Sequence, residues 1–154
     1  MFDPGPLKDC NNKLAESFAK TDSFLFRERQ PRGKIIYVVD DDRIDRQIAE
    51  RILGRAGYTV LMGSGGQDFF AAVAVEDIGF LITDLGLPLE PGIDILNALD
   101  KKERIGAMVV SGMAEDDNLV KEIISRDIPF LQKPYDEKEL LKIVVDYFGE
   151  PDNE

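Results

Sequence analysis

The 154-residue chain contains no histidine, and Cys10 is its single cysteine. Without histidine, Ser-His-Asp catalysis, imidazole-ligated metals and phosphotransfer from a histidine of this chain are all excluded. A lone cysteine permits no internal disulfide, which favours a reducing compartment, and we expect the protein to be cytoplasmic.

Basic residues and long apolar runs are also scarce. The chain has 19 Lys and Arg against 30 Asp and Glu, giving a net charge of −11, with no basic cluster longer than KK or RER. We therefore expect no direct nucleic-acid partner. The longest apolar run, Phe69 to Val75, is far too short to cross a bilayer, and the N-terminus carries no visible secretory signal. We expect no membrane association.

From Ile35 onward, strand-like and helix-like patterns alternate. The patterns predict strands at 35–39, 57–61, 78–83, 107–111 and 128–132, and helices at 44–55, 67–75, 93–101, 116–126 and 136–148. Consecutive β-α units predict an α/β fold in which a doubly wound five-stranded parallel sheet carries helices on both faces.

The two ends of the chain do not follow this rhythm. Residues 1–33 read as an N-terminal extension or linker with a possible helix from Leu7 to Arg27. A flexible arm and a docking or dimerising helix are equally consistent with that composition. Residues 34–149 form the expected domain, and residues 150–154 read as a disordered tail.

Polar residues follow several of the expected strands at the point where each strand ends. Asp40, Asp41 and Asp42 follow the first strand, Asp84 the third, Ser111 the fourth and Lys133 the fifth. The carboxyl ends of parallel strands share one edge of a sheet, so we expect these side chains to converge. Two carboxylates ~4 Å apart repel by ~4 kcal/mol at an effective dielectric of ~20, so the acids either fan out into water or are gathered by a cation.

These residue types suit divalent-cation and phosphate chemistry. Carboxylate oxygens from Asp40, Asp41 and Asp84, with no imidazole or thiolate, favour Mg²⁺ or Mn²⁺ over zinc. Lys133 and Ser111 could bind phosphoryl oxygens, and a carboxylate could be the nucleophile. Asp42 reads more simply as a helix N-cap.

Together, Asp40-Asp41, Asp84, Ser111 and Lys133-Pro134 resemble the receiver domain of bacterial two-component response regulators, over about Lys34 to Phe148. The stretch DLGLPLEPG also resembles the family's Asp-x-x-Met-Pro loop, with Leu87 in place of the usual Met. The resemblance implies a flavodoxin-like strand order 2-1-3-4-5. It also implies a phosphoacceptor switch rather than a classical enzyme.

The resemblance further implies roles for individual residues. Asp84 would be the phosphoacceptor, Ser111 and Lys133 would bind the phosphoryl group, and Phe130 would be the aromatic switch, without the hydroxyl of the usual Tyr. The metal ligands would be Asp40, Asp41, Asp84 and the backbone carbonyl of Gly86. The peptide bond before Pro134 would be cis.

A histidine kinase or histidine phosphotransfer protein would be the phosphoryl donor. The output would pass to a downstream protein or a homodimer through the fourth helix, fifth strand and fifth helix of the expected domain. In the last helix, Leu141, Val145 and Phe148 make a second apolar face, which predicts a partner surface unless the helix is deeply buried. Because little sequence follows Phe148, we expect a stand-alone receiver or one cut from a larger chain.

Two other functions remain open at this point. VVDDDR also fits a haloacid-dehalogenase-type phosphatase with Asp40 as nucleophile and Asp42 as acid-base. In a phosphatase of this type Asp84 would have no role. That family also needs a further acidic pair on a strand beyond the lysine, where this chain has a helix pattern instead. A receiver used only as a docking scaffold is the other alternative, which the intact set of acids, Ser111 and Lys133 disfavours.

Overall fold

The computed structural model describes residues 33–88, 91–99 and 105–151. The possible helix from Leu7 to Arg27 lies outside the described residues, as do Cys10 and residues 152–154 of the expected tail. Pro151, also placed in that tail by the sequence, lies beside Gly57, where an added Cβ would be 3.3 Å from the proline Cβ.

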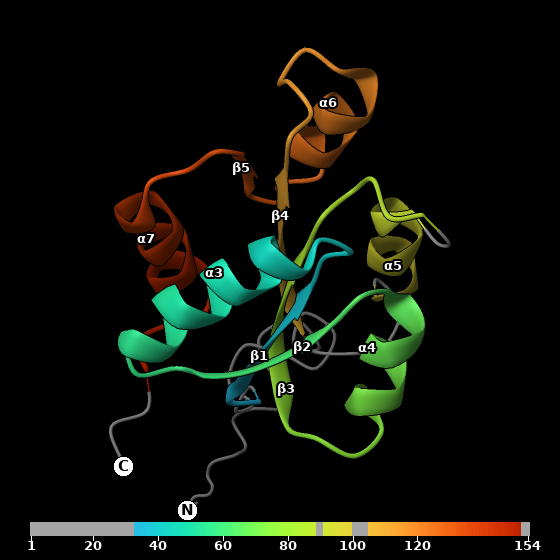
Figure 1. The fold of residues 1–154 in the computed structure, drawn as a ribbon. Coiled ribbons are helices and arrows are strands. Elements are labelled where there is room, and N and C mark those ends of the chain that lie inside the picture. Colours follow the sequence, from blue (N-terminus) through green and yellow to red (C-terminus); the bar gives the residue numbers. More distant parts are fainter. Residues whose placement is uncertain (1–32, 89–90, 100–104, 152–154) are drawn as a thin grey trace, which may run out of the picture. The chain divides into compact units, whose positions relative to one another are not determined.

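Five strands form one parallel sheet in the order β2-β1-β3-β4-β5, which confirms the predicted fold class and strand order (Figure 1). The strands are β1 Ile35–Val39, β2 Thr59–Gly63, β3 Ile78–Thr83, β4 Gly106–Ser111 and β5 Phe130–Gln132. The helices are α3 Arg43–Arg55, α4 Gly66–Val73, α5 Gly92–Leu99, α6 Asn118–Ser125 and α7 Glu137–Tyr147.

Alternating side chains of the sheet pack against two layers of helices. In β1, Ile36 and Val38 join a buried cluster with residues of α3 and α7, whereas Tyr37 and Val39 join a cluster with residues of α4, α5 and α6. The ribbon shows the same division, with α3 and α7 on one side of the strands and α4, α5 and α6 on the other (Figure 1). All six positions of β3 are buried, as expected for a central strand covered on both faces.

Some element boundaries differ from the prediction because local hydrogen bonds set them. β2 begins at Thr59 rather than residue 57, since Gly57 has φ +104° and its N–H donates to the Gly54 carbonyl in the turn after α3. α6 begins at Asn118 rather than 116, since the Asp117 side chain caps it by accepting from the Leu119 N–H. β5 spans three residues rather than five.

The second apolar face of α7 packs in part against the core. The Phe148 ring stacks on Phe80 with centroids 5.3 Å apart and lies 6.1 Å from the Tyr58 ring. Leu141 also packs against the buried cluster beneath α3 and α7. Leu141, Val145 and Phe148 are all half-buried, so core packing accounts for part of this face and the partner surface stays a prediction.

Within the described parts of the chain, no helix has both the length and the apolar character needed to span a bilayer.

Gly92, the first residue of α5, brings this helix close to the end of β3. Its N–H donates to the Leu85 carbonyl at 3.0 Å, and a Cβ at Gly92 would collide with the Asp84 carbonyl oxygen. Only a residue without a side chain allows the helix to begin this close to the backbone of Asp84.

Gly92→Ala should therefore lower the free energy of unfolding by about 1–3 kcal/mol, the usual cost of overpacking. Gly54→Ala is the matched control. Gly54 lies exposed in α3, where an added Cβ meets a flexible Glu50 side chain at 3.6 Å, so Ala should stabilise the helix by roughly 0.5–1 kcal/mol. Urea unfolding measures the change in the free energy of unfolding for both variants. Equal stability of Gly92→Ala and wild type would contradict the close approach of α5 to the backbone of Asp84.

Candidate functional site

Backbone hydrogen bonds just beyond the strands bring the polar residues to one edge of the sheet. The Asp84 N–H donates to the Val39 carbonyl at 3.1 Å, which joins the ends of β3 and β1. The Lys133 N–H donates to the Ser111 carbonyl at 2.8 Å, which joins the ends of β5 and β4. The predicted convergence at the carboxyl edge is thus built by the main chain.

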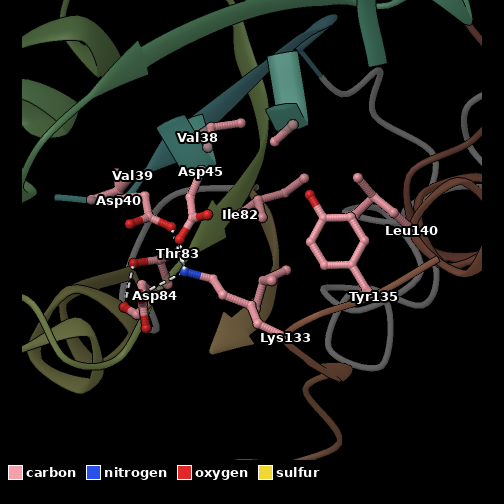
Figure 2. A pocket seen from close by; sticks show the side chains of 12 residues that line it. Val38, Val39, Asp40, Asp45, Ile82, Thr83, Asp84, Lys133, Tyr135 and Leu140 are labelled. Atoms are coloured by element: carbon pink, nitrogen blue, oxygen red, sulfur yellow. Dashed lines mark hydrogen bonds and ion pairs between the residues drawn. The ribbon is translucent and has the colours of Figure 1, made fainter. Parts of the chain in front are cut away.

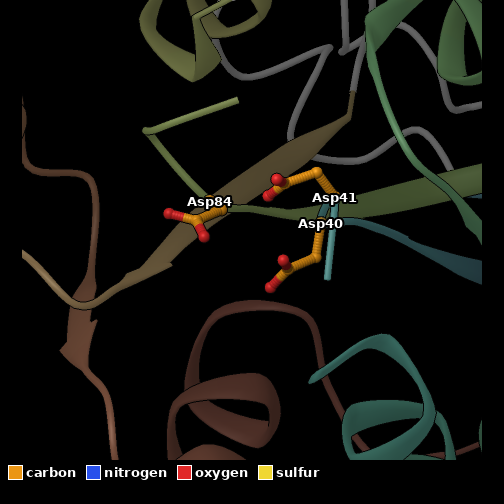
Figure 3. Close-up of side chains that lie close together, drawn as sticks. All are labelled: Asp40, Asp41 and Asp84. Atoms are coloured by element: carbon orange, nitrogen blue, oxygen red, sulfur yellow. The ribbon is translucent and has the colours of Figure 1, made fainter. Parts of the chain in front are cut away.

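Three carboxylates meet at this edge. One oxygen from each of Asp40, Asp41 and Asp84 lies within 4.8 Å of the others (Figure 3). Asp40 is buried, Asp84 is half-buried and Asp41 is exposed, so the cluster is open to solvent on one side. Hard oxygen ligands at this spacing fit Mg²⁺ or Mn²⁺, and Mg²⁺ uses few protein carboxylates and retains water.

The Lys133 ammonium lies among three carboxylates. Its Nζ is 2.8 Å from Asp40 Oδ2, 2.9 Å from Asp45 Oδ2 and 3.0 Å from Asp84 Oδ2 (Figure 2). An ammonium group has three N–H donors, so each carboxylate can take one. Lys133 therefore links the ends of β1, β3 and β5 to the first turn of α3.

Burial and hydrogen bonding shift the pKa values of Lys133 and Asp40 in opposite directions. Burial alone would lower the pKa of Lys133, but hydrogen bonds from its ammonium to Asp40, Asp45 and Asp84 raise that pKa above the ordinary value. Burial raises the pKa of Asp40 despite the hydrogen bond from Lys133. The lysine is thus held charged, while the ionised form of Asp40 is disfavoured until a further cation arrives.

The Asp84 carboxylate is held at both oxygens. Its Oδ1 accepts from the N–H groups of Leu85 at 2.6 Å and Gly86 at 3.3 Å, and its Oδ2 accepts from Lys133. The buried Thr83 hydroxyl donates to the Asp84 carbonyl at 2.9 Å and steadies the backbone at the end of β3. These contacts orient the carboxylate before any ligand binds.

The turn between β1 and α3 confirms one prediction. Asp42 is the N-cap of α3, and its Oδ1 accepts from the N–H groups of Ile44 at 2.9 Å and Asp45 at 3.2 Å. Its own N–H donates to Asp40 Oδ1 at 3.0 Å, and Arg46 Nη1 donates to the Asp40 carbonyl at 2.7 Å. Asp42 therefore organises the turn and is not one of the three clustered acids.

The other predicted residues lie near this edge, and their roles stay predictions. Ser111 is buried at the end of β4, where its hydroxyl accepts from the Met113 N–H at 3.3 Å, and among the described residues it makes no hydrogen bond to Asp84. Phe130 opens β5 beside Val109 and packs, partly buried, on the α4-α5-α6 side. The Lys133–Pro134 peptide bond is cis, as predicted.

The sequence analysis missed Asp45, Arg46, Thr83 and Tyr135. Asp45 is three residues after the N-cap, and this position in the first turn was the available signal. Tyr135 and Leu140 line the apolar side of the pocket whose polar side holds Lys133 and its carboxylates (Figure 2). Burial, followed by the nearby Asp45 charge, raises the pKa of the Tyr135 phenol.

Comparison with known proteins agrees with this geometry. Residues 36–145 match the family described as the response regulator receiver domain. The transcriptional regulatory protein GltR of Pseudomonas aeruginosa is 30% identical over 112 residues, which are 71% of this chain and 46% of that protein. The response regulator protein TodT of Pseudomonas putida is 29% identical over 116 residues, 75% of this chain and 51% of that protein. The chain thus spans about half the length of these relatives.

Solved structures show the same fold. A response regulator receiver protein from Pseudomonas putida superposes with a TM-score of 0.67 and 26% identity, covering 76% of this chain and 98% of that one. The signal receiver domain of an HD domain-containing protein from Pseudomonas fluorescens gives a TM-score of 0.67 at 21% identity, covering 75% and 94%. The second likeness concerns the fold alone.

Asp40→Asn should stabilise the metal-free protein and remove its response to Mg²⁺. Because the folded-state pKa of Asp40 is raised, the protonated carboxyl favours the fold at low pH, and this stabilisation is lost as the pH rises through that pKa. At neutral pH the ionised carboxyl costs stability, and a neutral Asn removes that cost. Wild type should gain about 2.7 kcal/mol at a Mg²⁺ concentration of roughly 100 times Kd.

Thermal unfolding at neutral pH, with and without Mg²⁺, measures both the stability of the metal-free variant and its response to Mg²⁺. The variant should melt higher than wild type without metal and show little shift with it. A variant that melts lower than wild type in both buffers would mean that Asp40 is needed for the fold itself.

Proposed function

The chain belongs to the response regulator receiver family, and from that premise we propose that it is a signalling switch controlled by phosphorylation of Asp84. The observation that carries the proposal is the position of Lys133, whose ammonium lies 3.0 Å from Asp84 Oδ2 beside the three clustered acids. A held nucleophile, a fixed positive charge and a set of cation ligands are the parts that phosphoryl transfer needs.

In the proposed reaction, an Asp84 carboxylate oxygen attacks the phosphorus of the donor. A new P–O bond to Asp84 forms as the bond from phosphorus to the donor's histidine nitrogen breaks, and the histidine leaves with its electron pair. Asp40, Asp41 and Asp84, with the Gly86 carbonyl, would hold Mg²⁺, and the bound cation would supply charge neutralisation for the phosphoryl oxygens. Lys133 would neutralise the remaining charge, and the Ser111 hydroxyl would donate to a phosphoryl oxygen.

The proposed donor is a histidine kinase or a histidine phosphotransfer protein in the cytoplasm. Phosphorylation adds roughly one negative charge at Asp84, and Ser111 would turn toward it and leave space for Phe130. Moving a two-state equilibrium from 1:99 to 99:1 takes about 5.5 kcal/mol, which several charge-assisted contacts can supply. The surface of α6, β5 and α7 would then change shape for a downstream protein or a second copy of the chain.

The family match and the place of Asp84 beside Asp40 favour this function over the haloacid-dehalogenase-type phosphatase. A phosphatase with Asp40 as nucleophile would give Asp84 no part in the reaction. The complete set of acids with Lys133 also favours an active receiver over a docking scaffold.

Asp84→Asn should abolish labelling by acetyl phosphate in the presence of Mg²⁺, because an amide oxygen cannot form the acyl phosphate. Intact-protein mass spectrometry measures the labelled fraction. Asp94→Asn, which removes an exposed acid from the first turn of α5, is the control and should label as wild type does. Labelling that survives in Asp84→Asn would favour the phosphatase with Asp40 as nucleophile.

Gly86 predicts a short-lived phosphoprotein. It is exposed two residues after Asp84, and among the described residues a Cβ there would meet Met113 Cε at 4.0 Å, so water can approach the acyl phosphate. Gly86→Leu should lengthen the half-life by shielding the phosphoryl group. Gly65→Leu, an open position after β2, should leave it unchanged. The decay of labelled protein gives the half-lives, and one of many hours in wild type would contradict the prediction.

A further inference from the structure

Asp45 contacts the proposed phosphorylation machinery without belonging to the group of possible metal ligands. Its Oδ2 lies 2.9 Å from Lys133 Nζ, whereas the clustered acids are Asp40, Asp41 and Asp84. It comes from the first turn of α3, while the other two carboxylates on Lys133 come from strand ends. In Figure 2 its carboxylate points toward the ammonium from the side of this helix.

The three carboxylates on Lys133 are not equally exposed. The side-chain exposure is 37% for Asp45, against 7% for Asp40 and 14% for Asp84. All three ammonium donors are used, so a phosphoryl group that binds Lys133 has to replace one of these acceptors. Asp45 is the one that water can solvate most readily after release, and the one with no proposed part in metal binding.

We propose that Asp45 is a positioning residue that competes with the phosphoryl group for Lys133. The proposal rests on the proposed function. In the unphosphorylated protein Asp45 occupies one lysine donor and adds negative charge, which disfavours an incoming phosphodonor and favours a cation. Phosphorylation of Asp84 releases Asp45 from Lys133 into solvent.

Asp45→Asn should therefore weaken Mg²⁺ binding and speed up labelling. The dissociation constant for Mg²⁺ should rise about two- to five-fold, the range expected for a half-exposed ion pair, because a negative charge near the cation is lost. At saturating Mg²⁺ the rate of labelling by acetyl phosphate should increase by a similar factor, because a neutral amide oxygen holds Lys133 less strongly than a carboxylate does and the site repels the anion less. Isothermal titration calorimetry measures the dissociation constant for Mg²⁺, and mass spectrometry measures the labelling rate.

Asp42→Asn is the matched control. It removes the same charge from the same turn, and Asn is as good an N-cap as Asp, but Asp42 makes no hydrogen bond to Lys133. Thermal unfolding should show that both variants are folded. Weaker Mg²⁺ binding together with faster labelling in Asp45→Asn, both absent from Asp42→Asn, would support the proposal.

The proposal is overturned if Asp45→Asn behaves as Asp42→Asn does, or if it binds Mg²⁺ as tightly as wild type does. It is also overturned if Asp45→Asn labels more slowly than wild type and binds Mg²⁺ more weakly, because that result indicates a purely structural role. Failure of the proposed function gives a different result. In that case wild type itself does not label, or Asp84→Asn labels as well as wild type.

Discussion

The site depends on the contact between the ammonium group of Lys133 and three carboxylates. The carboxylates of Asp40, Asp41, Asp45 and Asp84 outnumber the Lys133 ammonium and the Arg46 guanidinium, which donates to the Asp40 carbonyl. A bare cluster of this kind repels itself, and the raised pKa of Asp40 reflects the cost of burying such a charge. Lys133 reduces the repulsion among the carboxylates, and the remaining negative charge favours binding of a divalent cation.

The rest of the molecule holds this cluster in place. β3 is buried along its whole length, and its neighbours extend their backbone hydrogen bonds to Asp84 and Lys133. Gly92 lets α5 begin against the backbone of Asp84, and Asp42 caps α3 beside Asp40. The polar edge is thus carried on rigid strands rather than on long loops, which suits a site that must present fixed charges to a phosphoryl group.

The fold and the strand-end residues were predictable because each depends on local patterns. Runs such as those of β1 and β3 identify buried strands, and the end of a parallel strand determines which edge the next residue occupies. The core contacts of Phe148 were not predictable, because apolar residues on a second helix face do not reveal what they pack against. Here that is Phe80 and Tyr58, which lie far away along the sequence.

The sequence by itself determined the α/β fold, the meeting of Asp40, Asp41 and Asp84 and the cap at Asp42, because strand and turn geometry follow from neighbouring residues. Only the tertiary structure decided that Asp45 reaches Lys133 at 2.9 Å. That contact requires α3 to lie on the sheet through Ala49 and Leu53, so that Asp45 in its first turn comes within reach of the Lys133 side chain. The packing of a helix on a sheet is a property of the whole core, which no local pattern encodes.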